Sequence, residues 1–162
     1  PRIAVINASG ANTLYQLYNG IFEEEKLRWN NGAPNFELIE RFYNKMNDDE
    51  SLKPKTKATA IQIGKPSNIA KGLRALDFTN GIVEEVSDKE MLDGMSVVGL
   101  NGFDCEMASG ASVAGIKKLR DKEIIKKDDK VIGILTGRQK EPLLPIDYHN
   151  DPGNKFARPP KI

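Results

Sequence analysis

The sequence predicts an α/β fold in three layers, with a mostly parallel sheet that has helices on both faces. The segment 2–7 is short, rich in β-branched residues and without polar alternation, which is typical of a strand covered on both faces. Further short strands are expected at 82–86, 103–106 and 131–135. Amphipathic helices separate these segments, and strands that alternate with helices favour parallel pairing through right-handed crossovers.

The first half of the chain contains two expected helices. After the turn at Ser9-Gly10, apolar residues recur at spacings of three and four, which places them on one helical face: Leu14, Leu17, Tyr18, Ile21 and Phe22. The polar, glycine- and proline-containing stretch 30–34 ends that helix. A second amphipathic helix begins at Pro34, with Phe36, Ile39, Phe42, Tyr43 and Met46 on one face. The polar stretch 47–57 is expected to be an exposed connection.

The second half is more regular. Ser67 is a candidate cap for a helix carrying Ile69, Leu73 and Leu76, and Gly81 precedes the strand 82–86. A capping box from Ser87 to Glu90 opens a helix whose inward residues are Met91, Leu92, Met95 and Val98. A further helix is expected at 109–119. Residues 1–141 are therefore predicted to form one domain, and 142–162 a proline-rich tail that lies on a surface.

Composition and charge exclude several classes of partner. The 162 residues include 24 basic and 23 acidic side chains, so no net field attracts nucleic acid or an anionic membrane. No apolar run approaches the roughly 20 residues that cross a membrane. Cys105 is the single cysteine, which is compatible with a reducing compartment, and a cytoplasmic location is expected.

Two loops are the best candidates for a ligand site. The stretch 105–115 (CEMASGASVAG) and the strand end at Thr136-Gly137 both follow expected strands. In open parallel sheets ligands collect at the carboxyl ends of strands, where the amino termini of helices converge. The alternative reading is structural: the small residues from Ala108 to Ala114 let a helix pack tightly on the sheet, with Ser109 as its cap.

Other reactive residues have simpler explanations. Arg138 follows a strand, where an arginine is usually solvated, and His149 lies in the tail, where a surface role is expected. The thiol of Cys105 precedes a carboxylate that raises its pKa, which argues against a nucleophile. Lys65 is the lysine in a turn shaped by glycine and proline. No metal-ligand cluster, nucleotide-binding glycine loop or hydrolase motif is present in the sequence.

Five blocks of the sequence, in order, resemble the threonine synthase family. They are PRIAVINASGANTLYQLY from Pro1, KATAIQIGKPSNIAKGLRAL from Lys57, GIVEEVSDKEMLDG from Gly81, CEMASGASVAGIKKLR from Cys105 and DDKVIGILTGRQKEP from Asp128. The resemblance implies a pyridoxal-phosphate enzyme of fold type II, of which this chain matches the C-terminal part of the large domain. The family converts O-phospho-L-homoserine and water to L-threonine and phosphate.

The resemblance also assigns roles to residues. Thr136 matches the hydroxyl that bonds the pyridine nitrogen of the cofactor, and Gly137 lets the chain turn there. Glu106, Ala108 and Ser109 match the loop beside the cofactor ring. The sequence departs from the family pattern in two places: Met107 stands where proline is usual, and Arg138 stands where histidine is usual, before a loop that is one residue shorter.

The resemblance implies that the chain alone is incomplete. The family's Schiff-base lysine, ring-hydroxyl asparagine and glycine-rich phosphate loop have no counterpart in this sequence, so no catalytic residue is assigned and the chain alone is expected to be inactive. The expected partners are the substrate O-phospho-L-homoserine, the missing N-terminal half of the enzyme or a second copy in a homodimer. Two alternatives stay open: a related enzyme of the same fold, such as a threonine dehydratase or cysteate synthase, or a non-catalytic module for dimerisation or regulation.

Overall fold

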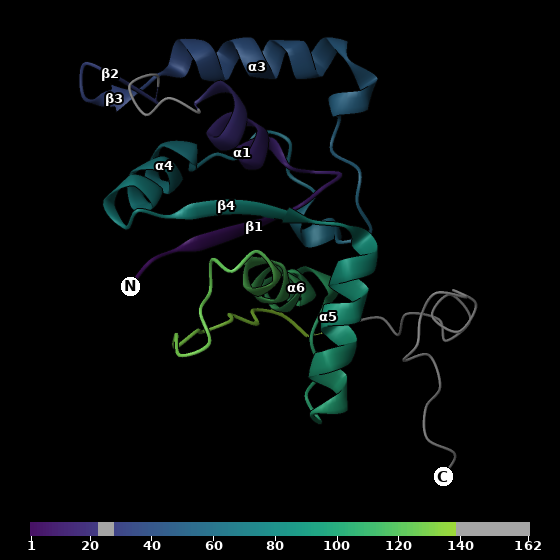
Figure 1. Ribbon diagram of the computed structural model, residues 1–162. Helices are drawn as coiled ribbons and strands as arrows, with labels where there is room; N and C mark the ends of the chain where they lie inside the picture. Colours follow the sequence, from purple (N-terminus) through teal and green to yellow (C-terminus); the bar gives the residue numbers. More distant parts are fainter. Residues whose placement is uncertain (23–27, 139–162) are drawn as a thin grey trace. The chain divides into compact units, whose positions relative to one another are not determined.

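The computed structural model describes residues 1–22 and 28–138 (Figure 1). The contacts divide the chain into two compact units, Pro1–Asp88 and Lys89–Ile162, and each is described by itself. The expected tail at 142–162, with His149, lies outside the described residues. The first unit contains the two longest strands, and the second contains the two loops of the candidate site.

A parallel pair of strands forms the sheet of the first unit. β1 (Ala4–Ala8) pairs with β4 (Ile82–Val86), with Ala4 opposite Ile82 and Ala8 opposite Val86. This pairing confirms the predicted α/β class with parallel strands. β1 is less buried than expected, because only Ala8 is fully buried and Ala4 is exposed. Its one partner among the described residues is β4, so its other edge makes no ladder within this part of the chain.

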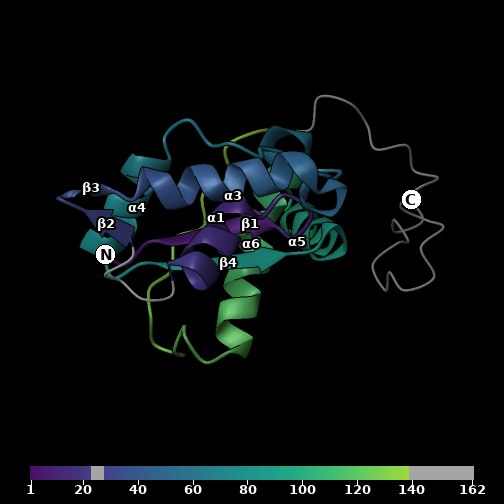
Figure 2. The same cartoon turned by 90° about the horizontal axis from the view of Figure 1, so that it is seen from above.

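The helices of the first unit lie on one side of this strand pair (Figures 1 and 2). α1 (Thr13–Gln16) contacts both strands and continues as the π-helical turn η1 (Leu17–Ile21), which α3 (Phe36–Asp48) contacts in turn. α4 (Ile69–Phe78) leads into β4. Their apolar faces form one core of buried residues, which comprises Leu17, Tyr18, Phe22, Ile39, Phe42, Ile69, Leu73, Leu76 and Val83. The helical spacings read from the sequence therefore identified most of the core-facing residues, but Phe36, expected on the same face as Ile39 and Phe42, is 50% exposed because it is the first residue of α3.

A short hairpin separates η1 from α3, at the stretch expected only to end a helix. β2 (Trp29–Asn30) pairs antiparallel with β3 (Ala33–Pro34). The two turn residues, Asn31 and Gly32, have φ values of 50° and 76°. Asparagine followed by glycine is the usual choice for such a two-residue turn, because both positions need a left-handed backbone. The sequence signal for this hairpin is the Asn-Gly pair.

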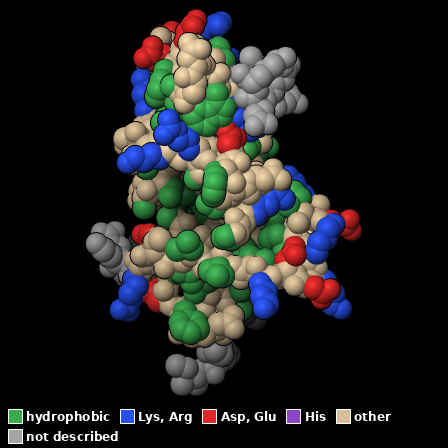
Figure 3. Space-filling model, turned by 90° about the vertical axis from the view of Figure 1, so that its left-hand side faces the viewer, with side chains coloured by type: hydrophobic (Ala, Val, Ile, Leu, Met, Phe, Trp, Pro, Cys, Tyr) green, Lys and Arg blue, Asp and Glu red, His purple; other side chains and the backbone are tan. Residues whose placement is uncertain are grey.

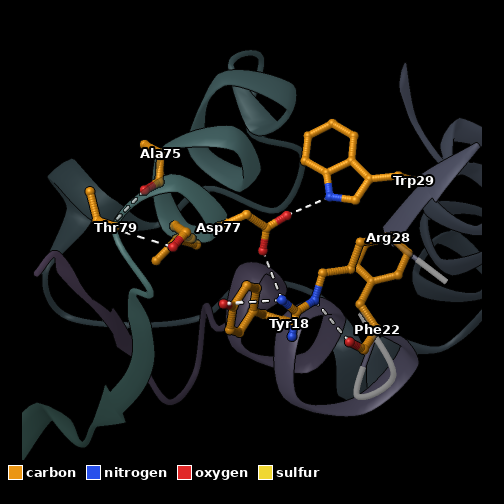
Figure 4. A network of polar contacts seen from close by, with 8 residues as sticks. Tyr18, Phe22, Arg28, Trp29, Ala75, Asp77 and Thr79 are labelled. Atoms are coloured by element: carbon orange, nitrogen blue, oxygen red, sulfur yellow. Dashed lines mark hydrogen bonds and ion pairs between the residues drawn. The ribbon is translucent and has the colours of Figure 1, made fainter. Parts of the chain in front are cut away.

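An ion pair joins the start of the hairpin to α4 (Figure 4). A nitrogen of the Arg28 guanidinium lies 2.7 Å from the Asp77 carboxylate, and both side chains are about 85% buried, with relative exposures of 13% and 15%. The same guanidinium lies over the ring of Tyr18 at 4.1 Å, and its Nε donates to the carbonyl of Phe22 at 3.0 Å. The indole of Trp29 donates to the second carboxylate oxygen of Asp77. This network ties three segments of the first unit together.

Two predicted details of the first unit are wrong. Ser67 does not cap α4: the helix begins at Ile69, Asn68 occupies the cap position, and no side chain accepts a hydrogen bond there. The stretch 47–57 is not entirely a connection, because α3 continues to Asp48 and a 3-10 turn, η2, spans Glu50–Leu52. A further 3-10 turn, η3, spans Thr59–Ile61.

The second unit is built on two helices in backbone contact. α5 spans Asp88–Leu100 and α6 spans Met107–Asp121. A Cβ added at Gly94 would collide with the carbonyl oxygen of Gly110, and a Cβ added at Gly110 would collide with the carbonyl oxygen of Met91. Glycine is therefore required at both positions for this approach, since a side chain on either helix would push them apart.

The strands predicted in the second unit do not form. Residues 103–106 and 131–135 belong to no strand, and the second of these segments, expected to be buried, is exposed: Ile132 is 90% and Ile134 67% exposed. The physical reason is that no strand within the described part of the second unit lies beside either segment to complete a ladder. Phe103 is also 70% exposed, and apolar side chains are visible between lysines and arginines on the surface in Figure 3. Among the described residues, no helix is both long and apolar enough to cross a membrane.

Candidate functional site

The two loops singled out from the sequence meet in the second unit. The backbone N–H of Glu106 donates to the carbonyl of Gly137 at 3.0 Å. The hydroxyl oxygen of Ser109 accepts from the N–H of Thr136 at 3.0 Å and from that of Gly137 at 3.2 Å. Three hydrogen bonds thus hold the segment at Thr136-Gly137 against the first turn of α6, although the expected strand before it is absent.

Ser109 has a different role from the cap considered in the structural reading. It is the third residue of α6, its side chain is buried at 2% exposure, and its oxygen accepts from the facing loop. The cap position belongs to Glu106, which has extended backbone angles and makes no side-chain capping bond. The reading of Ser109 as a helix cap is therefore wrong, because the helix begins two residues earlier than expected.

Gly137 and Glu106 are in close contact. A Cβ added at Gly137 would collide with the carboxylate of Glu106, so the backbone at Gly137 passes directly against that carboxylate. Glu106 is half-buried, as is Ala108 in the first turn of the helix. The position after Thr136 therefore favours glycine for a reason of space, and the Glu106 side chain is the neighbour that would have to move.

Thr136 is an exposed residue whose side chain makes no hydrogen bond within the described residues, while its backbone is held by Ser109. A hydroxyl on a fixed backbone can donate one hydrogen bond or accept two without carrying charge. The four other predicted site residues, Gly137, Glu106, Ala108 and Ser109, lie within the same loop pair.

The small residues of α6 were interpreted from the sequence either as part of a ligand site or as a surface for tight helix packing, and the structure gives them two different contacts. Gly110 packs against the backbone of α5, which supports the packing alternative, except that the neighbour is a helix where a sheet was expected. Ser109, one residue earlier, faces the opposite loop. The same short stretch therefore serves both helix packing and loop attachment.

The remaining candidates behave as solvated or inert groups. Arg138 lies 3.5 Å from Asp104 in an ion pair whose side chains are 85% and 47% exposed, which makes it a weak surface interaction. Burial raises the pKa of the Cys105 thiol, and the nearby Asp104 and Glu106 carboxylates raise it further, in line with the expected lack of nucleophilicity. In the first unit, the ammonium of Lys65 lies 5.6 Å from the ring centre of Tyr43.

Ser112 and Ile116 were missed by the reasoning from sequence. The hydroxyl of Ser112 donates to the carbonyl of Ile134 at 2.9 Å, and Ile116 lies beside the backbone of Gly133. Together with Ser109 they recur at spacings of three and four, which places them on one face of α6. That spacing was the available signal, and it marks the helix face along which the segment after residue 131 runs.

A second polar group was also missed, in the first unit. At the carboxyl ends of β1 and β4, the amide of Asn12 donates to Glu85 at 2.6 Å and the amide of Gln16 donates to Asn12 at 2.7 Å. The side-chain oxygen of Asn7 accepts from the N–H of Tyr15 at 3.0 Å. These side chains bond one another or the backbone. Among the described residues, no group of His, Cys, Asp or Glu side chains could hold a metal ion.

Comparison with known proteins identifies the class. A family model described as pyridoxal-phosphate dependent enzyme matches residues 1–137. The chain belongs to this family of pyridoxal-phosphate dependent enzymes.

Individual relatives within the family carry one name. The threonine synthase of Methanosarcina acetivorans is 43% identical over 101 residues, which is 61% of this chain and 25% of that protein. The threonine synthase of Methanocaldococcus jannaschii is 36% identical over 118 residues, 71% of this chain and 29% of that protein. The chloroplastic threonine synthase 2 of Arabidopsis thaliana is 29% identical over 166 residues, covering 99% of this chain and 28% of that protein. The chain therefore spans little more than a quarter of the length of these relatives.

Proposed function

We propose that this chain supplies one side of the pyridoxal-phosphate site of a threonine synthase, which converts O-phospho-L-homoserine and water to L-threonine and phosphate. Membership of the family and the shared name of the relatives support this activity. The observation that carries the proposal is the loop pair in which Ser109 holds the backbone of Thr136, an exposed residue whose hydroxyl has no hydrogen-bond partner among the described residues.

The donor set at this loop pair is suitable for the cofactor. A neutral hydroxyl can bond a pyridine nitrogen without keeping it protonated, and Thr136 offers such a hydroxyl from a fixed backbone. The backbone at Gly137 carries no side chain that would obstruct a flat ring. When bound, the cofactor supplies an electron sink, and an unprotonated ring nitrogen makes that sink milder, which suits elimination and replacement at the β and γ carbons.

The other residues of the site have positioning roles in this proposal. Ser109 orients the Thr136-Gly137 segment through two hydrogen bonds, and Glu106 adds a third through its backbone N–H. Glu106, Ala108 and Ser109 form the flank beside the ring. The Arg138 side chain pairs with Asp104 on the surface, and we assign it no role toward the cofactor.

Further parts of the site come from outside this sequence in our proposal. The lysine that anchors the cofactor covalently, the asparagine for its ring hydroxyl and the glycine-rich phosphate loop are supplied by the N-terminal half of the enzyme. Assembly of the complete enzyme as a homodimer and a cytoplasmic location are part of the same proposal. The chain alone binds the cofactor weakly and releases no phosphate from the substrate.

Titration of purified chain with pyridoxal phosphate, followed by cofactor fluorescence and equilibrium dialysis, tests the role of Thr136. Replacing Thr136 with Val removes the hydroxyl and should weaken binding by about fivefold, the effect of one hydrogen bond of about 1 kcal/mol. Thr136→Ser keeps the hydroxyl and should bind like the unmodified chain. Equal affinity of the Val and Ser variants would contradict the role proposed for Thr136.

Phosphate release from O-phospho-L-homoserine tests the proposed division of the site. The chain with saturating pyridoxal phosphate is expected to give no release above the rate without protein. Release that is lost in the Thr136→Val variant would show that the chain holds a complete site. In that case the assignment of the lysine and the phosphate loop to the N-terminal half is wrong.

A further inference from the structure

Four asparagine-glycine pairs occur in the sequence, and each is a chemically reactive dipeptide. They are Asn19-Gly20, Asn31-Gly32, Asn80-Gly81 and Asn101-Gly102. Glycine has no side chain to keep its backbone nitrogen away from the side-chain carbonyl carbon of the asparagine before it. Attack of that nitrogen on that carbon requires both groups to be free, so the hydrogen bonds of each pair decide which pair reacts.

Helical structure holds two of the pairs. Asn19 lies within η1, and its side-chain amide donates to a carbonyl of β4 at 2.9 Å. At the end of α5, the side-chain amide of Asn101 donates to the carbonyl of Val97 at 2.8 Å. The N–H of Gly102 donates to the carbonyl of Gly99 at 2.9 Å. In both pairs, helical hydrogen bonds must break before the two reacting groups can meet.

Burial holds a third pair, Asn80-Gly81, between α4 and β4. Gly81 is buried, and its N–H donates to the carbonyl of Leu76 at 2.6 Å. The Leu76 side chain fills the space beside it, because a Cβ added at Gly81 would collide with that side chain. The nitrogen that would have to attack is therefore both bonded and enclosed.

The pair Asn31-Gly32, at the tip of the β2–β3 hairpin, has none of these restraints. Both residues are exposed, and neither the Asn31 side chain nor the N–H of Gly32 makes a hydrogen bond to a described residue. Apart from chain neighbours, no atom lies within 4 Å of the place that a Cβ on Gly32 would take. The hairpin ladder has two residue pairs, so the turn opens at little cost in free energy.

We propose that Asn31 is a site of spontaneous deamidation through a cyclic imide with Gly32. The backbone nitrogen of Gly32 bonds to the side-chain carbonyl carbon of Asn31, the bond from that carbon to the amide nitrogen breaks, and ammonia leaves with the proton of the Gly32 N–H. Water then opens the ring. Opening at the side-chain carbonyl gives aspartate, and opening at the main-chain carbonyl gives isoaspartate. Water is the only co-reactant.

The two products differ in their effect on the hairpin. Aspartate followed by glycine suits the same two-residue turn, so this product keeps the hairpin and adds a negative charge at its tip. Isoaspartate lengthens the backbone by one methylene group, which changes the geometry of the turn and should loosen the ladder. Trp29 is the single tryptophan of the chain, and its indole donates from β2 to Asp77. Its fluorescence should therefore change as isoaspartate accumulates.

Peptide mapping of aged protein tests the choice of site. Trypsin cleaves after lysine and arginine, which places the four pairs in four different peptides, with Asn31 in Trp29–Arg41. After incubation of the folded chain at mildly alkaline pH, this peptide should gain about 1 Da on conversion of the amide to a carboxylate. Fragmentation of the peptide should assign the gain to Asn31.

Conversion at Asn31 should be at least about tenfold faster than at the other three pairs, because their hydrogen bonds must open first. In urea, where no fold holds them, the four pairs should convert at similar rates. Equal rates in the folded chain, or the same preference for Asn31 in urea, would overturn the proposal.

Two glycine variants separate Asn31 from the other exposed asparagine of a pair. Asn31→Gly removes the amide and keeps a residue that suits the turn, so the acidic form that ion exchange resolves in the aged chain should disappear. The matched control is Asn101→Gly, at an exposed position, which should leave that form unchanged. Circular dichroism checks that both variants keep the fold.

Isoaspartate itself is measured by an isoaspartyl methyltransferase, which transfers a methyl group from S-adenosylmethionine to its carboxylate. Aged unmodified chain and aged Asn101→Gly should be labelled, and aged Asn31→Gly should not. Labelling that persists in Asn31→Gly would place the reaction elsewhere, and no labelling of the unmodified chain would exclude the cyclic imide. None of these measurements involves the cofactor, so their outcome is independent of the proposed function.

Discussion

The strand β1 in the first unit and the segment 131–135 in the second have similar sequences and different structures. Both are short, apolar and rich in isoleucine and valine. β1 lies beside β4 and forms a parallel ladder with it, whereas 131–135 lies along a helix and forms none. The comparison teaches that an apolar β-branched pattern indicates an extended backbone, while a strand also needs a neighbouring strand to complete its hydrogen bonds.

The largest expected difference between the two units concerns burial of leucine. Leu73→Ala removes a side chain that is 0% exposed in the core of the first unit and should lower the free energy of unfolding by about 2–5 kcal/mol. Leu135→Ala in the second unit changes a residue that is 43% exposed and should cost less than about 1 kcal/mol. Urea denaturation followed by circular dichroism measures both. Similar losses for the two variants would show that the segment 131–135 is buried in solution.

The next effect concerns the ion pairs of the two units. Asp77→Asn leaves the guanidinium of Arg28 largely buried without its counter-charge and should cost about 2–3 kcal/mol. The matched control in the second unit is Asp121→Asn, whose partner Lys117 is 78% exposed. That change should leave the urea midpoint unaltered, because solvent screens an exposed pair. If both variants behaved alike, the network around Arg28 would contribute no more than a surface pair.

A smaller effect is expected where α5 and α6 touch. Gly110→Ala forces a methyl group against the carbonyl of Met91 and should cost about 1–3 kcal/mol. In α5, Gly99 has open space around it, and Gly99→Ala should stabilise by about 0.5–1 kcal/mol through helix propensity. Thermal unfolding should therefore shift in opposite directions for the two variants. A stabilising Gly110→Ala would mean that the helices lie further apart than described.

The smallest effect concerns the thiol of Cys105. Its pKa is raised by burial and by the neighbouring Asp104 and Glu106 carboxylates, so the folded state holds the thiol proton more firmly than the unfolded state. This difference in proton affinity contributes fully to the free energy of unfolding below the thiol pKa of the unfolded state, which is about 8.5. The contribution is lost as the pH rises through the thiol pKa of the folded state. Cys105→Ala should therefore show a smaller loss of stability between about pH 8 and pH 10 than the unmodified chain. Urea midpoints at the two pH values measure the difference, and equal losses would contradict the raised pKa.

The reasoning from sequence was most accurate for elements whose burial can be read from the local pattern of apolar residues. The spacing of apolar residues placed α3 and α4 and identified buried residues such as Leu73, because one face of a helix reports directly on the core. The strand β4 was placed at its observed bounds, 82–86. The strand predicted at 131–135 did not form because its hydrogen bonds depend on residues distant in the sequence, which a local pattern does not contain.

The candidate site was also predicted only in part. The proximity of its two loops was expected, but the residue that joins them was not. That the loops around Glu106 and Thr136 lie together was expected from the carboxyl ends of strands, yet the contact is made by Ser109 without those strands. Ser109 accepts from the facing loop and does not cap the helix because α6 begins at Met107, two residues before Ser109. The exact start of a helix is the part of it that a sequence pattern fixes least well. Roles toward the cofactor stay predictions until Thr136 is tested.

The close contact of α5 and α6 restricts which residues are tolerated at two positions of the chain. Each of Gly94 and Gly110 faces a main-chain carbonyl, so the obstacle to a larger residue is backbone that no substitution shortens. A side-chain clash can be relieved by a compensating change in the neighbour, whereas a clash with backbone cannot. Suppressor mutations of a defect at either glycine should therefore be reversions or changes that move a whole helix.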